Sequence, residues 1–197
     1  MTREEFMRDY WRYYLLLEEK FRQTINYVEL SEDNFSTYSI EYAYLLQSIG
    51  GELDTFFKVY CGFPLNDRNK DMRDYRNTTI ANYPGIVSQK VSVQEYGLEL
   101  QPFKAWSHGS VEWWSAYNSL KHNRSQNIKC ASQKNVLNAL SALNILEIKY
   151  LSEIVEATDD PDCPDQPSEI FKLVGWNMRY MPFGKTGCYI SFEEKPD

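Results

Sequence analysis

One short segment, residues 112–124, concentrates the side chains of this sequence that could do chemistry. It reads Glu-Trp-Trp-Ser-Ala-Tyr-Asn-Ser-Leu-Lys-His-Asn-Arg. At about 100° per residue on a helix, Asn118, Lys121 and His122 fall on one face, and Asn118 can touch His122 four residues on. An imidazole changes its protonation near neutral pH, and an ammonium group beside it attracts anions. The segment therefore predicts an anion site centred on His122.

The charge distribution places this motif in the one basic stretch of an acidic chain. The 197 residues carry a net charge of −7, which argues against general, charge-driven binding of nucleic acid. Residues 101–149 nevertheless hold six Lys and Arg side chains against two acidic ones. Because the field at a site depends mainly on nearby charges, this stretch can attract an anion. The alternative is that these lysines form a solvated helix face.

The motif resembles that of the HEPN superfamily, small helical-bundle proteins common among prokaryotic toxins and defence systems. Their signature is an arginine, then Asn, Asp or His, and a histidine four to six residues further along a late helix. Here Asn118 stands at the polar position and His122 at the histidine. The string Trp-Trp-x-x-Tyr-Asn-x-x-Lys-His-x-Arg is also similar to an uncharacterised bacterial branch of that fold. The resemblance covers residues 1–60 and 110–157, and it implies RNA as ligand and a homodimer.

The arginine of the signature is missing, because Tyr117 stands in its place. In active HEPN proteins a 2′-hydroxyl attacks phosphorus, the histidine acts as acid or base, and the arginine stabilises the developing charge. Lys121 or Arg124 would have to supply that charge here. We therefore predict an RNA- or nucleotide-associated protein of a defence or toxin-type system, non-catalytic or a degenerate ribonuclease. Any remaining activity would be that of a metal-independent endoribonuclease, with His122 and Asn118 as candidate catalytic residues.

Further residues are candidate ligand contacts, and each also has a purely structural interpretation. The candidates are Tyr117, Lys121, Arg124, Trp114 and Glu52. Adjacent tryptophans either anchor a core or stack on bases.

A second hypothesis makes the chain a helical protein-interaction module with a structural Asn-Lys-His cluster. In it, His122 hydrogen-bonds a buried partner such as Glu52 or Glu41, and Asn118 bridges helices. A hydrolase or transferase for a small phosphorylated compound ranks last, because the sequence has no Gly-rich phosphate loop. Whether His122 is accessible or sealed inside the bundle discriminates between the first two hypotheses.

The elements that position the motif follow from helical periodicity in four stretches. A capping box at Thr2–Glu5 begins a helix that lasts to about residue 26. A second apolar stripe runs over 38–60, a third helix begins near residue 110, and a fourth begins near residue 132. Gly50 and Gly51 interrupt the second stripe at a cost of about 1 kcal/mol each. Close packing of another helix is the favoured reason, and a kink is the alternative.

Between and after these helices the period is lost. Residues 66–77 are expected to be a polar loop, 91–93 and 98–100 a short hairpin, and 159–168 an exposed acidic connection. The predicted fold is all-α, a four-helix up-down bundle with a short inserted β-hairpin and an irregular, β-leaning C-terminal tail. The predicted domains are a helical domain over 1–158, with its insertion at about 64–110, and a linker and extension over 159–197.

Cysteine usage and hydropathy bear on compartment and cofactors. The four cysteines are scattered without a CxxC, and only two histidines accompany them, so we expect reduced thiols, no metal and no cofactor. The charged N-terminus and the lack of a long apolar run predict a cytoplasmic protein with no membrane partner.

Overall fold

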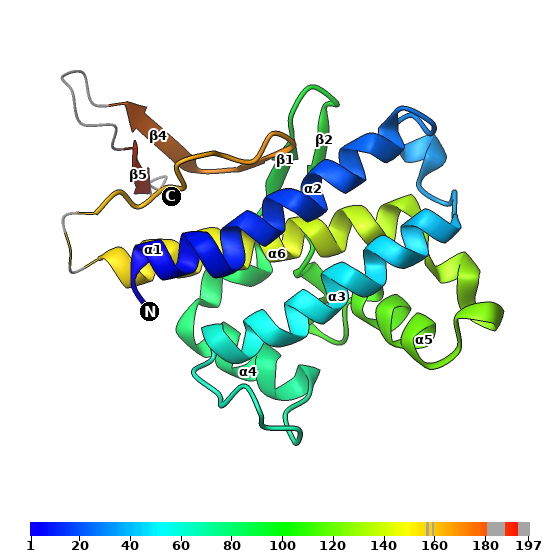
Figure 1. Cartoon of the computed structure of the whole chain (residues 1–197), viewed down its shortest axis with the longest axis horizontal. Helices are drawn as coiled ribbons and strands as arrows, with labels where there is room; N and C mark the ends of the chain where they lie inside the picture. Colours follow the sequence, from blue (N-terminus) through cyan, green and yellow to red (C-terminus); the bar gives the residue numbers. More distant parts are fainter. Residues whose placement is uncertain (157, 159, 181–187, 193–197) are drawn as a thin grey trace.

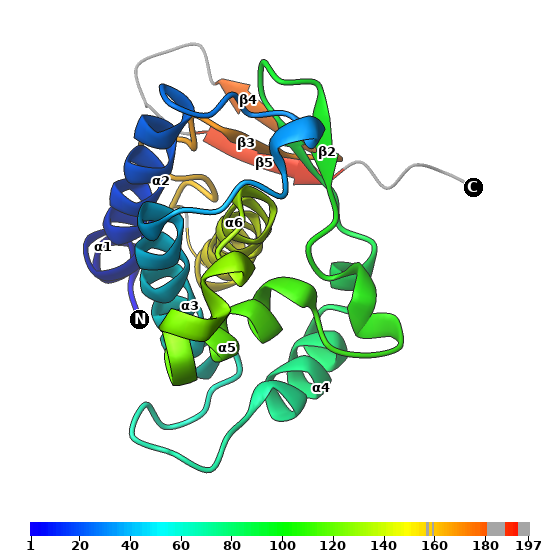
Figure 2. The same cartoon turned by 90° about the vertical axis from the view of Figure 1, so that its right-hand side faces the viewer.

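The computed structural model describes residues 1–156, 158, 160–180 and 188–192, and this part of the chain is mostly helical with small antiparallel sheets (Figure 1). The predicted predominance of helix is confirmed. The arrangement places one long helix, Gln133–Val155 (α6), at the centre. Viewed nearly along that helix, the first helices lie on one side, the motif helix below it and the strands above it (Figure 2).

The N-terminal helix is one continuous rod with a wide turn near its start. It comprises Arg3–Phe6 (α1), the π-helical turn Met7–Trp11 (η1) and Arg12–Ile25 (α2). The predicted capping box is present: the Thr2 side chain accepts from the backbone N–H of Glu5, and the Glu5 carboxylate accepts from that of Thr2. A π turn is a rare feature that often accompanies functional sites.

The second long helix, Ile40–Tyr60 (α3), explains one of the two glycines in its apolar stripe. It begins at Ser39, whose hydroxyl accepts from the Tyr42 N–H, and it follows a short turn at Glu32–Asn34 (η2). A Cβ added to Gly50 would lie 2.2 Å from Cδ2 of Tyr117, inside any permitted contact. The predicted close approach of another helix is therefore confirmed at Gly50. A Cβ on Gly51 would meet nothing within 4 Å.

The helix that bears the motif, Glu112–Asn127 (α5), is broken rather than straight. Asn123 leaves the helical region with φ −153° and ψ 83°. Its side chain accepts hydrogen bonds from the Gln126 N–H at 3.4 Å and the Ser125 hydroxyl at 2.9 Å, which restarts the last turn. A 3-10 turn, Ile128–Cys130 (η5), then leads to α6, which begins at Ser132 as predicted.

Helix α6 is buried on nearly all sides along most of its length. Helices α2, α3 and α5 pack against it, and α3 also contacts α5. A helix that is apolar all round belongs in a core, and the few polar side chains on such a helix must find partners inside the protein.

A helix lies where the sequence analysis expected a polar loop. Residues Met72–Asn82 form α4, so the loop prediction for 66–77 is wrong from residue 72 onward. Asp71 caps this helix in a capping box with Asp74. Only Tyr75 and Thr79 are buried, with the Tyr75 ring stacked on Phe57 at 5.2 Å between centroids. So small an apolar face leaves no recognisable stripe. Short turns at Pro84–Val87 (η3) and Lys104–Ser107 (η4) flank the hairpin.

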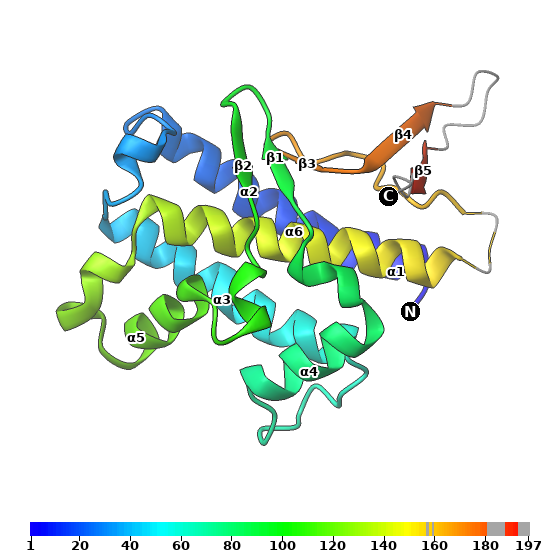
Figure 3. The ribbon, with the colours of Figure 1, turned by 180° about the vertical axis from the view of Figure 1, so that it is seen from behind.

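The predicted hairpin is confirmed, and a strand from the C-terminal region extends it. Val91–Val93 (β1) pairs antiparallel with Leu98–Leu100 (β2), and Phe171–Leu173 (β3) pairs with the other edge of β1. Trp176–Tyr180 (β4) and Cys188–Phe192 (β5) form a separate two-stranded sheet. Seen from behind, the hairpin crosses over α6 (Figure 3).

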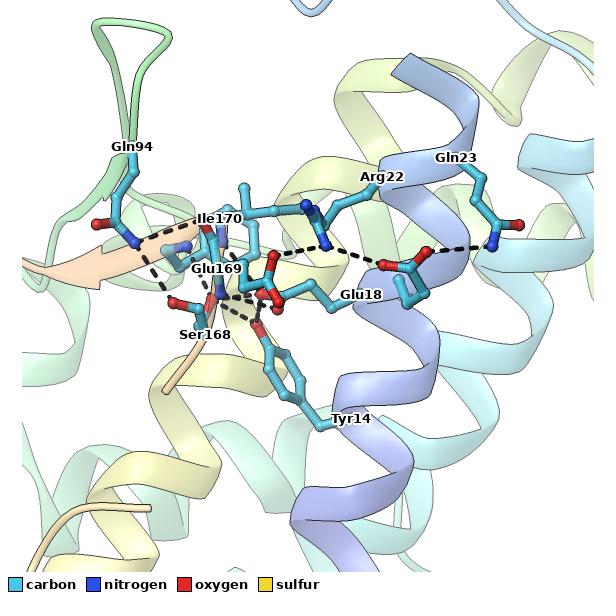
Figure 4. A network of polar contacts seen from close by, with 10 residues as sticks. Tyr14, Glu18, Arg22, Gln23, Gln94, Ser168, Glu169 and Ile170 are labelled. Atoms are coloured by element: carbon cyan, nitrogen blue, oxygen red, sulfur yellow. Dashed lines mark hydrogen bonds and ion pairs between the residues drawn. The ribbon is translucent and has the colours of Figure 1, made fainter. Parts of the chain in front are cut away.

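A buried carboxylate binds the chain after residue 160 to the N-terminal helix (Figure 4). Glu18 accepts hydrogen bonds from the Tyr14 hydroxyl at 2.8 Å, from the Ser168 hydroxyl and from the Glu169 N–H at 3.0 Å. Near the other end of the same rod, the Arg3 guanidinium donates to the carbonyl oxygen of Cys163 at 2.8 Å.

The prediction of an exposed connection over 159–168 is therefore wrong for Cys163, Pro164 and Ser168, which are buried. Directly after this connection, Ile170 and Phe171 of the predicted C-terminal extension are buried in the core.

The structure also bears on the predictions made for the cysteines and for membrane-spanning helices. Cys61 and Cys130 are free thiols. Among the described helices, none combines the length and the apolar character needed to cross a bilayer.

The glycine pair offers a matched test of this packing. Gly50→Ala should destabilise the protein by about 1–3 kcal/mol, because the methyl group would overlap the Tyr117 ring. Gly51→Ala, in open space, should be neutral or stabilise by up to about 1 kcal/mol through helix propensity. Urea unfolding of the two variants measures the difference, and equal stabilities would contradict the proposed α3–α5 contact.

Candidate functional site

The motif residues separate into a buried and an exposed group along α5. Trp114 and Tyr117 are buried, and their rings pack on each other with centroids 5.1 Å apart. As core residues they offer no ring face to a ligand, in contrast to the sequence-based expectation. Asn118 is half-buried, and Lys121 and His122 are exposed. Arg124, beyond the break at Asn123, is exposed as well.

His122 is therefore accessible, which answers the question that divided the two functional hypotheses. Neither His122 nor Asn118 makes a side-chain hydrogen bond to any residue that the structure describes. Lys121 places its Nζ 5.5 Å from the centroid of the Tyr117 ring. The hydrogen-bonded Asn-Lys-His cluster of the interaction-module hypothesis is thus not formed. By the same observation, no neighbour orients the imidazole as a general acid or base usually requires.

Glu52 does not belong to this group of side chains. Gly50 faces α5, and Glu52 lies two residues and about 200° further round α3. Its electrostatic neighbours are Tyr10, Tyr13 and the buried Glu147. No ion pair or hydrogen bond joins Glu52 to Lys121 or His122 within the described chain, so the suggested pairing is wrong.

The basic stretch keeps most of its charge unpaired. Of its two acidic residues, Glu112 binds Lys134 at 2.7 Å and Glu147 is buried in the core. Lys121, Arg124 and Lys129 are exposed and form no ion pair with the described residues. Lys121, His122, Arg124 and Lys129 are exposed within nine consecutive residues of the chain, and we call this group the basic corner. It is a local positive region on an acidic protein.

A groove of about 820 Å³ borders the basic corner between the 32–38 segment, α5 and the start of α6. Ser119, one turn before the break in α5, lies in its wall together with Lys129, Glu32 and the Lys134–Glu112 ion pair. Tyr38 is exposed at the groove and is held in place by a β-bridge to Ser132. The groove therefore presents an accessible aromatic ring beside Lys129 of the basic corner.

The sequence analysis did not single out the most unusual polar residue in the core, Glu147. Its side chain is 0% exposed, and neither carboxylate oxygen has a hydrogen-bond partner among the described residues. Burial raises its pKa well above the ordinary value, and the negative charge of Glu52 raises that pKa further. Burial also raises the pKa of Glu52 itself.

The only sequence signal for Glu147 was an acidic residue inside the apolar run Ile145–Ile148. Amphipathic helices place such residues on their solvent face, so the signal was weak. Within the described residues no group of three or more His, Cys, Asp or Glu side chains is arranged to hold a metal ion.

Comparison of the chain with family models, with curated proteins and with solved structures finds no match. The function of this protein is therefore inferred from the chemistry of its own side chains.

The raised pKa of Glu147 determines how the free energy of unfolding should change with pH. Because its pKa is raised from 4.5, the folded state binds this proton more tightly than the unfolded state. The stabilisation is complete below the ordinary pKa and is lost as pH rises through the raised value, by up to about 1.4 kcal/mol per pH unit. Glu147→Gln should remove this loss and unfold at a higher temperature than the wild type at about pH 8.

The charged and titratable groups around Glu147 are Glu52 on α3, Tyr10 on η1 and Tyr14 on α2. Since the pKa of Glu52 is raised too, Glu52 adds to the slope in the same direction. Glu156→Gln, exposed at the end of α6, is the matched control and should keep the wild-type slope. Thermal melts across pH that leave the slope of Glu147→Gln unchanged would exclude Glu147 as its origin.

Proposed function

We propose that this protein binds single-stranded RNA at the basic corner and does not cleave it. The observation that carries the proposal is a set of exposed cations, Lys121, Arg124 and Lys129, with no acidic partner in the described part of a chain with net charge −7. A protein this acidic binds a polyanion only where local charge outweighs the total.

The chemistry of the corner suits a single strand. Lysine and arginine side chains attract phosphates, and an aromatic ring such as Tyr38 can stack on an unpaired base. Cleavage is not part of the proposal, because Tyr117 stands at the position of the family's arginine and is buried. His122, without an orienting neighbour, serves here as a polar contact.

We also propose that the long helices correspond to the HEPN bundle, with α2, α3, α5 and α6 as its four helices. Their mutual packing around α6 supports this correspondence. The resemblance of the motif then makes a defence or toxin-type system the setting of the RNA binding.

Replacing the three cations tests the proposal directly. The triple variant Lys121→Ala, Arg124→Ala and Lys129→Ala should bind a labelled uridine oligonucleotide of about twelve nucleotides at least about tenfold more weakly than the wild type. Three lost phosphate contacts should also make the slope of log affinity against log salt shallower by about 2. Fluorescence anisotropy measures both, and gel analysis of the same samples should show intact RNA.

The matched control removes three exposed positive charges elsewhere, through Arg12→Ala, Arg73→Ala and Lys172→Ala. It changes the net charge equally and should bind nearly as well as the wild type. Equal weakening in both triple variants would overturn the assignment to the corner. Absence of binding by the wild type at low salt would overturn RNA binding itself.

We further propose that two copies associate through α5, as the family resemblance implies. Pairing of two basic corners across a two-fold axis would double the cations facing one strand. Light scattering at micromolar protein, with and without the RNA, should give the mass of a dimer in at least the bound state. A strict monomer under both conditions would contradict this association.

A further inference from the structure

Three buried side-chain oxygen atoms on α6 accept no hydrogen bond from the described residues. Within the described chain, the buried side-chain atoms without a partner include Oδ1 of Asn144 and both carboxylate oxygens of Glu147. Asn144 and Glu147 are one turn apart on α6, so their side chains are neighbours. Buried polar atoms almost always have partners, and an orphaned set of acceptors calls for a donor that the chain itself does not supply.

Glu52 on α3 adds a further carboxylate to these acceptors. It stands one turn before Phe56 on α3, as Glu147 stands one turn before Tyr150 on α6. The rings of Phe56 and Tyr150 lie 5.5 Å apart, centroid to centroid, so the two glutamates occupy matching positions on helices in contact. No Lys, Arg or His of the described residues forms an ion pair with either glutamate. The hydroxyl of nearby Tyr14 donates to Glu18, so its proton is not available to Glu52 or Glu147. The missing complement is therefore a positively charged donor.

Aromatic rings line the same region. Phe56 lies 5.2 Å from Tyr10 and 5.5 Å from Tyr150, centroid to centroid, and Phe6 lies 5.9 Å from Tyr150. Ring faces attract cations through their quadrupole, most strongly where water is excluded. Carboxylates within an aromatic shell are the surroundings that an organic cation prefers.

Glu52 is half-buried, so this region reaches solvent at the surface of α3. Tyr13, Leu16 and Tyr44 are 40%, 54% and 53% exposed, unusually large values for such side chains. Tyr13 lies close enough to both Glu52 and Tyr44 for each to raise its pKa. Gly51, next to Glu52, leaves open space where other residues would carry a side chain. Exposed apolar surface on α2 and α3 therefore lies near Glu52, with the Nζ of Lys20 5.8 Å from the centroid of the Tyr44 ring.

We propose that Glu52 and Glu147 bind a primary ammonium group whose apolar tail lies on Tyr13, Leu16 and Tyr44. An ammonium group has three N–H donors, which suit the oxygens of Glu52, Glu147 and Asn144. A metal ion is a poorer fit, because it needs more ligands than two carboxylates and an amide supply, and no such group is present in the described chain. The site is separate from the basic corner, and its existence does not depend on RNA binding.

Binding should be coupled to loss of a proton. The ammonium ion pairs with Glu147 as a carboxylate, and because burial raises the pKa of this carboxyl group, binding favours release of its proton to solvent. Affinity should therefore rise with pH while the amine itself stays protonated. The groups facing this proton are Glu52, Tyr10 and Tyr14, and the phenols remain neutral over this range, since burial raises their pKa values.

Calorimetric titration with n-butylammonium chloride tests the proposal. Binding should strengthen between about pH 6 and pH 8, and the heats in phosphate and HEPES should differ as proton release requires. Glu147→Gln and Glu52→Gln should each weaken binding at least about tenfold. Glu156→Gln should bind as the wild type does. Because Glu147→Gln is expected to be more stable than the wild type near pH 8, its loss of binding would not reflect unfolding.

Two further probes make the outcome decisive. Butanol has the same tail without the charge and should produce no saturable heat. Manganese chloride examines the metal alternative and should not bind at the two glutamates. The proposal is overturned if butylammonium does not bind, if Glu147→Gln binds it equally well, or if manganese binds in a way that depends on Glu147 and butylammonium does not.

Discussion

The burial of α6 on nearly every side is the constraint on which the rest of the structure depends. Neighbouring elements must cover its whole circumference, and here α2, α3 and α5 together with the β1–β3 sheet do so. The approach of α5 is close enough that α3 needs a glycine at position 50. The hydrophobic effect supplies the driving force, and the limited room around one helix decides which side chains fit.

This burial also makes unpaired polar side chains on α6 energetically costly. Two of these side chains differ in how they are accommodated. Ser141 donates its hydroxyl to the carbonyl oxygen of Asn138, so it is satisfied locally. Glu147 has no such partner among the described residues, and burial raises its pKa. The contrast with Glu18 is instructive, since that buried carboxylate accepts several hydrogen bonds and joins the C-terminal region to the first helix. A buried carboxyl group without hydrogen-bond partners is a candidate ligand-binding group.

The two proposed sites lie on different sides of α3 and have opposite electrostatic character. The basic corner is exposed, hydrated and suited to a polyanion whose binding is weakened by salt. The pair of glutamates is enclosed by aromatic rings and suited to a cation whose binding is governed by proton exchange. The π turn at Met7–Trp11 belongs to the second site through Tyr10, whereas Trp11 turns to the C-terminal segment and donates to the carbonyl oxygen of Gln166.

Local sequence determined much of the helical framework and little of what its faces meet. The capping box at Thr2–Glu5 and the regular apolar spacing were enough to locate the three longest helical stretches. Helix α4 escaped notice because it buries only two side chains. The β-leaning character of the C-terminal tail was predicted, but the pairing of β3 with β1 was not, because β1 lies far back in the chain.

The motif shows the same division between local and tertiary information. Spacing correctly placed Asn118, Lys121 and His122 along one helix, but spacing alone left open whether that face was covered or free. Packing of Tyr117 against Gly50 buried one side of α5 and left Lys121 and His122 in solvent. On α6, where apolar residues occupy almost every position, periodicity could not say where Glu147 would point. Periodicity determines which side chains share a face, whereas only the tertiary contacts decide what that face meets.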